Sequence, residues 1–299
     1  MYLDDEFCEN SIRKHLEYDT DIIFFSETDS TNEEIKRRCR DYYRRAIDIN
    51  NGACPLVIVS DSQTGGKGRR GRSFFSPPGS GIYLSMLFIP ELLKASDSEM
   101  ISKGSDVGTG RDVDSVLITT QAAVAVASAI SEVCCRETSI KWVNDVYLND
   151  KKICGILTEA ISEPGSAHID MIVVGIGINV YRPVSMPDEL EGIMGHIYDA
   201  AADGQDIRGK LCAAVIDKLV RYYEALPDTA FLAEYKKRSN VIGQDIMFGT
   251  PGSIAGEVGD DWSYGRAVDI DDTGGLVVRL PDGSTQILHT GEITLRTRQ

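Results

Sequence analysis

Short apolar runs alternate with longer amphipathic stretches over the first four fifths of the chain. The apolar runs predict buried strands, because a strand covered on both faces carries little polar sequence; they are Ile22–Phe25, Leu56–Ser60, Ile82–Ile89, Ile140–Leu148, Lys152–Ala160 and Met171–Val180. Asn149-Asp150 predicts a hairpin between the fourth and fifth of these strands. The amphipathic stretches predict helices over 31–49, 115–135, 207–226 and 229–238. This mixture indicates an α/β or α+β domain.

Two further features complete the predicted elements. Ser30 and Glu33 have the spacing of a capping box, which predicts that the first of these helices begins at about Thr31. Residues 91–114 are polar, rich in Gly, Ser and Asp, and lack periodicity, so we expect an exposed insertion or loop there.

The pattern changes after Asn240, where short strand-like runs are separated by Gly and Asp turns. These runs are Asp245–Phe248, Ser253–Glu257, Gly265–Ile270, Leu276–Leu280 and Thr285–His289. Turns at roughly ten-residue intervals are typical of a small all-β module. We therefore predict two domains, residues 1–238 and residues 239–299.

Composition narrows the class of protein. The 299 residues include 31 Lys and Arg against 46 Asp and Glu, a formal charge of −15, which argues against broad nucleic-acid binding. The longest apolar stretch, Met171–Val180, is about half of what a membrane span needs. Asp4, Asp5 and Glu6 stand where a signal peptide would carry basic residues. Seven cysteines without a CxxC pair favour a reduced, cytoplasmic setting, and the four scattered histidines predict no zinc site.

The most informative segment is the Gly/Arg loop, residues 63–72. It places four cations in the six residues Lys67–Arg72, with glycines that let backbone N–H groups approach a ligand closely. Arginine forks suit carboxylates and phosphates, so the segment predicts an anion site. A dinucleotide-binding motif is excluded because two prolines follow instead of a helix, and a P-loop is excluded because Gly68 follows Lys67. A solvated basic loop, or an RNA-binding one, stays as an alternative.

Three polar motifs accompany this loop. Ser30-Thr31-Asn32 either caps a helix or binds a small polar ligand at the helix N-terminus. In Lys141-Trp-Val-Asn-Asp145, strand alternation would place Lys141, Val143 and Asp145 on one face; a surface lysine beside a core tryptophan is the alternative. The glycines of Gly175-Ile-Gly-Ile-Asn179 predict close approach of a ligand or another backbone to a buried strand.

Together and in this order, these motifs resemble the biotin protein ligases. The resemblance rests on Asp29–Asn32, Gln63 with Gly66–Arg72, Lys141–Asp145 with Lys151–Leu157, Gly175–Asn179 and Gly291–Arg296, and it covers residues 22–296. It implies an α+β fold: a class II synthetase-like mixed sheet with helices, followed by a small SH3-like all-β barrel.

The resemblance implies a two-step reaction that uses ATP, Mg²⁺ and biotin. Biotinyl-5′-AMP would form first, and its biotinyl group would then pass to a lysine on a biotin carrier domain of a biotin-dependent carboxylase. The implied catalytic residues are Lys141 and Arg69. Biotin would be bound by Ser30, Thr31, Asn32, Gln63, Lys67, Gly68, Arg69 and Lys141, and ATP by Gly66, Arg69, Arg70, Arg72, Phe74, Asn144, Asp145 and Asn179. The resemblance assigns no metal ligands.

The sequence departs from the family pattern at Lys67, usually arginine, Phe74, commonly tryptophan, and Val143, usually proline. Roughly 20 residues precede the first strand, too few for the winged helix-turn-helix of some bacterial members, so we expect no DNA binding. A homodimer is compatible with the sequence. The rival functions are a lipoate or octanoate protein ligase of the same fold, and a non-catalytic protein that binds biotin or RNA.

Overall fold

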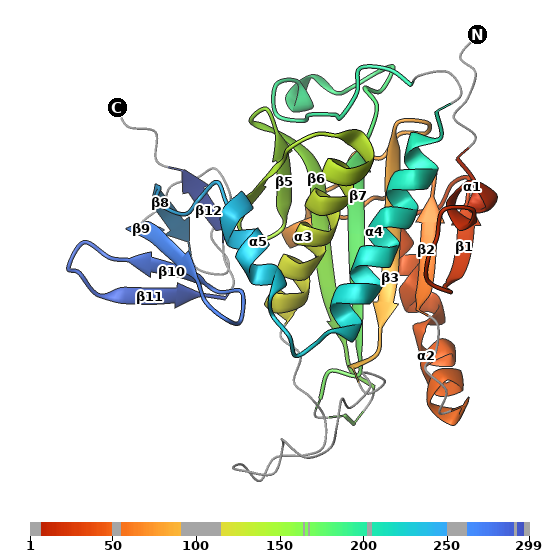
Figure 1. Cartoon of the computed structure of the whole chain (residues 1–299), viewed down its shortest axis with the longest axis horizontal. Coiled ribbons are helices and arrows are strands. Elements are labelled where there is room, and N and C mark those ends of the chain that lie inside the picture. The colour runs from red at the N-terminus through yellow and green to blue at the C-terminus, as the bar shows by residue number, and fades with distance from the viewer. Residues whose placement is uncertain are drawn as a thin grey trace.

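A seven-stranded mixed sheet forms the centre of the larger part of the protein (Figure 1). The computed structural model describes residues 7–49, 55–90, 115–163, 165–166, 168–201, 205–249, 262–289 and 292–295. The strands, in their order across the sheet, are β1 (Asp21–Phe25), β2 (Leu56–Ser60), β3 (Gly81–Phe88), β7 (Met171–Asn179), β6 (Lys151–Ile161), β5 (Asp145–Leu148) and β4 (Ser139–Lys141). β1 and β2 run parallel and the other neighbours run antiparallel, as expected for an α+β fold.

Helices cover both faces of this sheet. α2 (Thr31–Ile49) packs on one face, where Ile35 and Cys39 meet Ile58 and Val173. α3 (Ser115–Cys134) and α4 (Ile207–Glu224) lie on the other face, flanked by α1 (Glu9–Arg13) and α5 (Phe231–Arg238) (Figure 1). Every residue of β7 is buried, which explains its continuous apolar sequence.

α3 is long and apolar enough to cross a membrane by composition, and it is the one such helix in the described part of the chain. Most of its residues are buried against β6 and α4, so packing in the protein core accounts for its apolar sequence.

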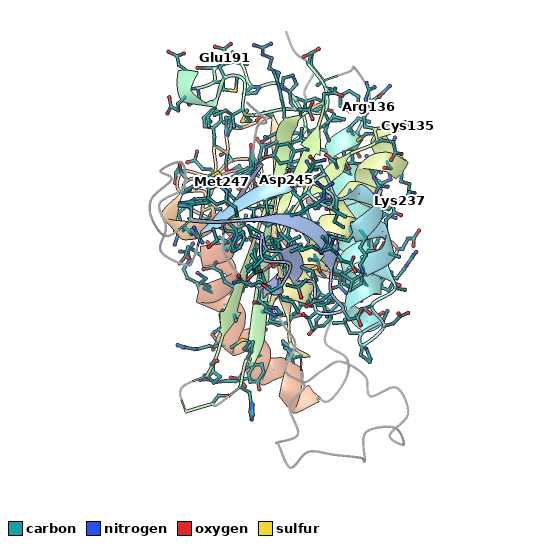
Figure 2. The ribbon with its side chains drawn as sticks, turned by 90° about the vertical axis from the view of Figure 1, so that its left-hand side faces the viewer. Cys135, Arg136, Glu191, Lys237, Asp245 and Met247 are labelled. Atoms are coloured by element: carbon teal, nitrogen blue, oxygen red, sulfur yellow. The ribbon has the colours of Figure 1, made fainter. Side chains whose placement is uncertain are left out.

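A second sheet follows α5. Its strands are β11 (Thr285–Leu288), β10 (Leu276–Arg279), β9 (Trp262–Ile270), β8 (Asp245–Gly249) and β12 (Glu292–Leu295), all antiparallel, which confirms the small all-β module. Figure 2 looks onto this sheet, where Asp245 and Met247 mark β8 in front of the large sheet. Buried residues of both sheets form one continuous core. The predicted strand Ser253–Glu257 and the predicted insertion 91–114 lie outside the described residues, and the domain boundary at 239 stays a prediction.

The single strand predicted over Ile140–Leu148 is wrong. β4 ends at Lys141, β5 begins at Asp145, and these two residues face each other across an antiparallel pair. Residues 142–144 form the connecting turn, in which the Trp142–Val143 peptide bond is cis. The predicted alternation of Lys141, Val143 and Asp145 on one face therefore does not hold. By contrast, the Asn149-Asp150 hairpin is confirmed, and both residues have the positive φ angles (50° and 61°) that such a turn requires.

The predicted capping box is also wrong, although α2 begins at Thr31 as expected. The Ser30 N–H donates to Asp29 Oδ1 at 2.7 Å, and the Thr31 N–H donates to Gln63 Oε1 at 2.9 Å. The Glu33 carboxylate instead accepts hydrogen bonds from Lys36 and Lys67. Hydrogen bonds to Asp29, together with the ion pairs of Glu33, thus replace the predicted capping box.

Candidate active site

A pocket of about 460 Å³ of atom-free space lies between the Gly/Arg loop, the start of α2, and strands β6 and β7. Nine of the residues predicted for biotin or ATP line it: Ser30, Thr31, Asn32, Gln63, Lys67, Gly68, Arg69, Phe74 and Asn144. The remaining lining residues are Lys152, Gly155, Ile156, Leu157, Gly175, Ile176 and Gly177.

The floor of the pocket is a buried polar network. Gln63 Oε1 accepts hydrogen bonds from the Thr31 N–H (2.9 Å) and the Thr31 hydroxyl (3.2 Å), while Gln63 Nε2 donates to Ser76 Oγ at 2.9 Å. The hydroxyl of Ser85 lies 2.8 Å from Thr31 Oγ1 and 2.5 Å from Asn32 Oδ1. Ser85 was missed in the sequence; its signal is one serine inside the otherwise largely apolar strand β3. The network fixes the side chains before any ligand enters.

A chain of charged groups connects this floor to the Gly/Arg loop. Asn32 Nδ2 donates to Glu159 Oε2 at 2.7 Å, and Glu159 Oε1 accepts from Lys36 Nζ at 2.6 Å. Glu33 then bonds Lys36 (2.9 Å) and Lys67 (2.7 Å). The ammonium groups of Lys67 and Lys36 lower the pKa of Glu33. Burial opposes the charge of Lys36, but Glu159 and Glu33 outweigh it and raise the pKa of Lys36.

Two glycines of β7 leave room for side chains of the pocket. A Cβ at Gly175 would lie well under 3.0 Å from the Asn32 amide, and a Cβ at Gly177 would overlap the ring of Phe74 in the same way. The glycines thus mark a close approach, but the approaching groups are the side chains of Asn32 and Phe74 and not the ligand or backbone that the sequence predicted. Phe74 lies over the strand and meets Tyr83 edge to face at 6.4 Å between ring centroids.

Arg69 is the arginine of the Gly/Arg loop that faces the pocket. Its Nη1 donates to Asn144 Oδ1 at 3.0 Å, and Asn144 Nδ2 donates to the carbonyl oxygen of Ile156 at 2.9 Å. Arg70 and Arg72 are exposed and do not line the pocket, so the structure separates them from Arg69, Phe74 and Asn144. Gly66 is the buried glycine of this loop, and a Cβ there would overlap the backbone oxygen of Phe74.

Besides Lys67 of the Gly/Arg loop, a second lysine, Lys152 on β6, lines the pocket. Its Nζ lies 2.7 Å from Asp145 Oδ1, and the side chains are 31% and 22% exposed. Lys141, on β4, does not line the pocket, nor does Asn179 at the end of β7. The sequence placed Lys152 within a matching segment but gave it no role.

No resident metal site is visible in the part of the chain that the structure describes, where no group of three or more His, Cys, Asp or Glu side chains could hold an ion. The six cysteines of that part are free.

Comparisons with known proteins identify the family to which the chain belongs. Residues 25–179, more than half of the chain, match the biotin/lipoate A/B protein ligase family. The chain belongs to this family. Residues 254–296 separately match the biotin protein ligase C terminal domain.

Relatives of this family member include the bifunctional ligase/repressor BirA of Bacillus subtilis, 28% identical over 80% of this chain and 66% of that protein. The chain therefore spans about two thirds of the length of that relative. The biotin–[acetyl-CoA-carboxylase] ligase of Mycobacterium tuberculosis is 28% identical over 90% of this chain and 86% of that protein. The structure of the biotin protein ligase from Aquifex aeolicus in complex with biotin and ATP has the same fold, with a TM-score of 0.66 and 23% identity over 93% and 99% of the two chains.

Proposed function

We propose that this family member is an ATP-dependent biotin–protein ligase that acts through biotinyl-5′-AMP. The observation that carries the proposal is a pocket in which a fixed polar floor lies beside three cations, Lys67, Arg69 and Lys152. The second match, to the C-terminal domain of biotin protein ligases, favours biotin over lipoate.

The polar floor suits the ring system of biotin. Thr31, Asn32 and Gln63 offer amide and hydroxyl groups in fixed orientations, and Ser30 lies beside them. A flat polar group bound there would direct the valeryl chain and its carboxylate toward the cationic side of the pocket. We assign Lys67 and Gly68 to the cover over biotin, since both line the pocket from the Gly/Arg loop.

The first chemical step joins two anions. The biotin carboxylate attacks the α-phosphorus of ATP, and pyrophosphate leaves. Preorganised positive charge stabilises the negative charge that develops on the transferred group, and Lys152 and Arg69 are placed for this role. Mg²⁺ would be held mainly by the triphosphate and would neutralise part of its charge.

We assign Phe74 and Asn144 to the adenosine side of the pocket, with Asp145 holding Lys152. Arg70, Arg72 and Gly66 would act on phosphates from the Gly/Arg loop, and Asn179 from the end of β7. Lys141 stays the sequence-based prediction for the catalytic lysine. The position of Lys152 makes it the stronger candidate.

In the second step, the amine of an acceptor lysine attacks the anhydride carbonyl and AMP leaves. We propose that the acceptor is a biotin carrier domain of a carboxylase and that the reaction takes place in the cytoplasm. The M. tuberculosis relative, named biotin–[acetyl-CoA-carboxylase] ligase, supports this choice of acceptor.

Incubation with biotin, ATP, Mg²⁺ and a biotin carrier domain tests the proposal by intact mass. The acceptor should gain one biotinyl group, and an acceptor with its target lysine replaced by arginine should gain none. ATP–pyrophosphate exchange separates the rival ligase: exchange driven by lipoate and not by biotin would overturn the assignment. Tight, salt-sensitive RNA binding without exchange would favour the non-catalytic alternative.

A further inference from the structure

The turn between β9 and β10 of the C-terminal sheet, Asp271–Gly275, contacts the turn that carries Asn144. The indole N–H of Trp142 donates to the carbonyl oxygen of Gly274 at 2.9 Å, and both residues are buried. The tip of this C-terminal turn also lies against α3, because a Cβ at Gly274 would come within 3.1 Å of Thr120. The two sheets therefore meet at a defined hydrogen bond next to the pocket.

Hydrogen bonds to the Asp271 side chain hold the 271–275 turn together. Asp271 Oδ1 accepts hydrogen bonds from the Thr273 N–H (2.9 Å), the Thr273 hydroxyl (2.8 Å) and the Gly275 N–H (2.8 Å). Burial opposes ionisation of this carboxyl group, but the bonds from Thr273 and Gly275 outweigh it and lower the pKa of Asp271. Gly274 has φ = 84°, a conformation that favours glycine.

The 142–144 turn is held at each of its residues. Trp142 is held by Gly274, and the Val143 carbonyl oxygen accepts the hydroxyl of Tyr235 on α5 at 3.2 Å. Asn144 exchanges hydrogen bonds with Ile156 of β6, as donor through its side chain (2.9 Å) and as acceptor through its backbone oxygen (3.0 Å). Asn144 Oδ1 then receives Arg69.

We propose that the 271–275 turn is a positioning element of the active site, which holds Arg69 over the pocket through Trp142 and Asn144. This inference rests on the proposed function. It assigns the C-terminal sheet a role in retaining the acyl-adenylate: when Gly274 loses its hold on Trp142, Asn144 shifts, Arg69 closes less firmly, and the intermediate escapes faster.

Trp142→Phe tests this role, because it removes the N–H and keeps a buried aromatic ring. We expect release of biotinyl-AMP from the preformed complex to become about fivefold faster, the factor of one neutral hydrogen bond. Asp271→Ala loosens the same turn without touching the core, and it should also speed release. Release is measured by chasing labelled biotinyl-AMP from the full-length protein, normalised to the folded fraction.

Trp262→Phe is the matched control. Trp262 is the second of the two tryptophans, lies buried on β9 of the same sheet, and its Nε1 has no hydrogen-bond partner among the described residues. This variant should lose stability without any change in release rate. If Trp142→Phe and Trp262→Phe accelerate release of biotinyl-AMP equally, the cause is general loosening of the C-terminal sheet, and the proposal is overturned.

A double-mutant cycle completes the test. If Trp142 acts through Arg69, adding Trp142→Phe to Arg69→Ala should change release by less than twofold. The positioning role would be overturned if the effects of Trp142→Phe and Arg69→Ala on the release rate multiply. It would also be overturned if release is unchanged in both Trp142→Phe and Asp271→Ala. Neither result would affect the ligase assignment. Failure of the unmodified protein to form any adenylate would instead overturn the function, and the positioning role with it.

Discussion

Replacement of Lys152 tests which of two lysines is catalytic, Lys141 as predicted from the sequence or Lys152 as favoured by the structure. Lys152→Gln keeps most of the length of the side chain and a hydrogen-bond donor but removes the charge that lines the pocket. Lys141→Gln makes the same chemical change on β4, at a residue that does not line it. The two variants therefore differ in position and not in chemistry.

The expected magnitudes separate catalysis from stability. Loss of one preorganised donor at a developing charge typically lowers the rate by a factor of about 10² to 10³. The ion pair between Lys152 and Asp145 is partly exposed, and such pairs contribute about 1 kcal/mol or less to folding. A domain with about 5 kcal/mol or more of stability stays folded after that loss, so unfolding cannot explain a 100-fold decrease.

ATP–pyrophosphate exchange with biotin, run beside thermal unfolding, provides the measurement. Lys152→Gln should lower the exchange rate at least 100-fold with only a small change in Tm, whereas Lys141→Gln should lower it by less than tenfold. The reverse result, with Lys141→Gln inactive and Lys152→Gln within threefold of the unmodified protein, would refute the assignment and restore the prediction from the sequence.

Three further predictions follow from the same pocket. Gly177→Ala should force the ring of Phe74 away from β7 at a cost in folding stability of about 1–3 kcal/mol. The variant should therefore have a lower Tm and a raised KM for ATP. Unchanged values would mean that the ring moves freely. Arg69→Gly should release biotinyl-AMP and label bystander proteins, as mass spectrometry of a protein mixture would show; labelling confined to the acceptor would contradict the closing role of Arg69. Lys67 lowers the pKa of Glu33, so the stabilising contribution of Glu33 is fully present above the ordinary carboxyl pKa and disappears as pH falls through the lowered value. The Tm of the unmodified protein should thus approach that of Glu33→Gln in acid, and a constant difference across that range would exclude the ion pair.

Elements were predictable where the sequence carries a continuous apolar run or a helical period. The prediction for Leu56–Ser60 agrees with β2 at both ends, and that for residues 31–49 agrees with α2. The start of α2 was right for the wrong reason: Asp29 takes the Ser30 N–H that Glu33 would have accepted in a capping box, and Gln63 accepts the N–H of Thr31. Gln63 is distant in sequence, so no local pattern could reveal this bond.

The 142–144 turn was not predictable for the same reason. Trp142 and Val143 look like strand residues, but their partners Gly274 and Tyr235 lie about 90 to 130 residues further along the chain. Once the turn forms, Lys141 and Asp145 pair with each other, and β6 brings Lys152 to the pocket. The resemblance, and not the predicted strand, had assigned the catalytic role to Lys141, which the structure leaves outside the lining of the pocket.

The charges around the pocket explain how a chain of net charge −15 can bind anions. Both lysines that line the pocket already have carboxylate partners, Lys67 with Glu33 and Lys152 with Asp145. Those carboxylates offset much of the attraction for a distant anion, so net charge is not what selects the ligand. What they provide is fixed orientation: each ammonium group is held at 2.7 Å before an anion arrives, and little reorganisation remains to be made when charge develops. The site thus depends on the placement of its cations more than on their number, and for that reason a glutamine at Lys152 should cost far more activity than stability.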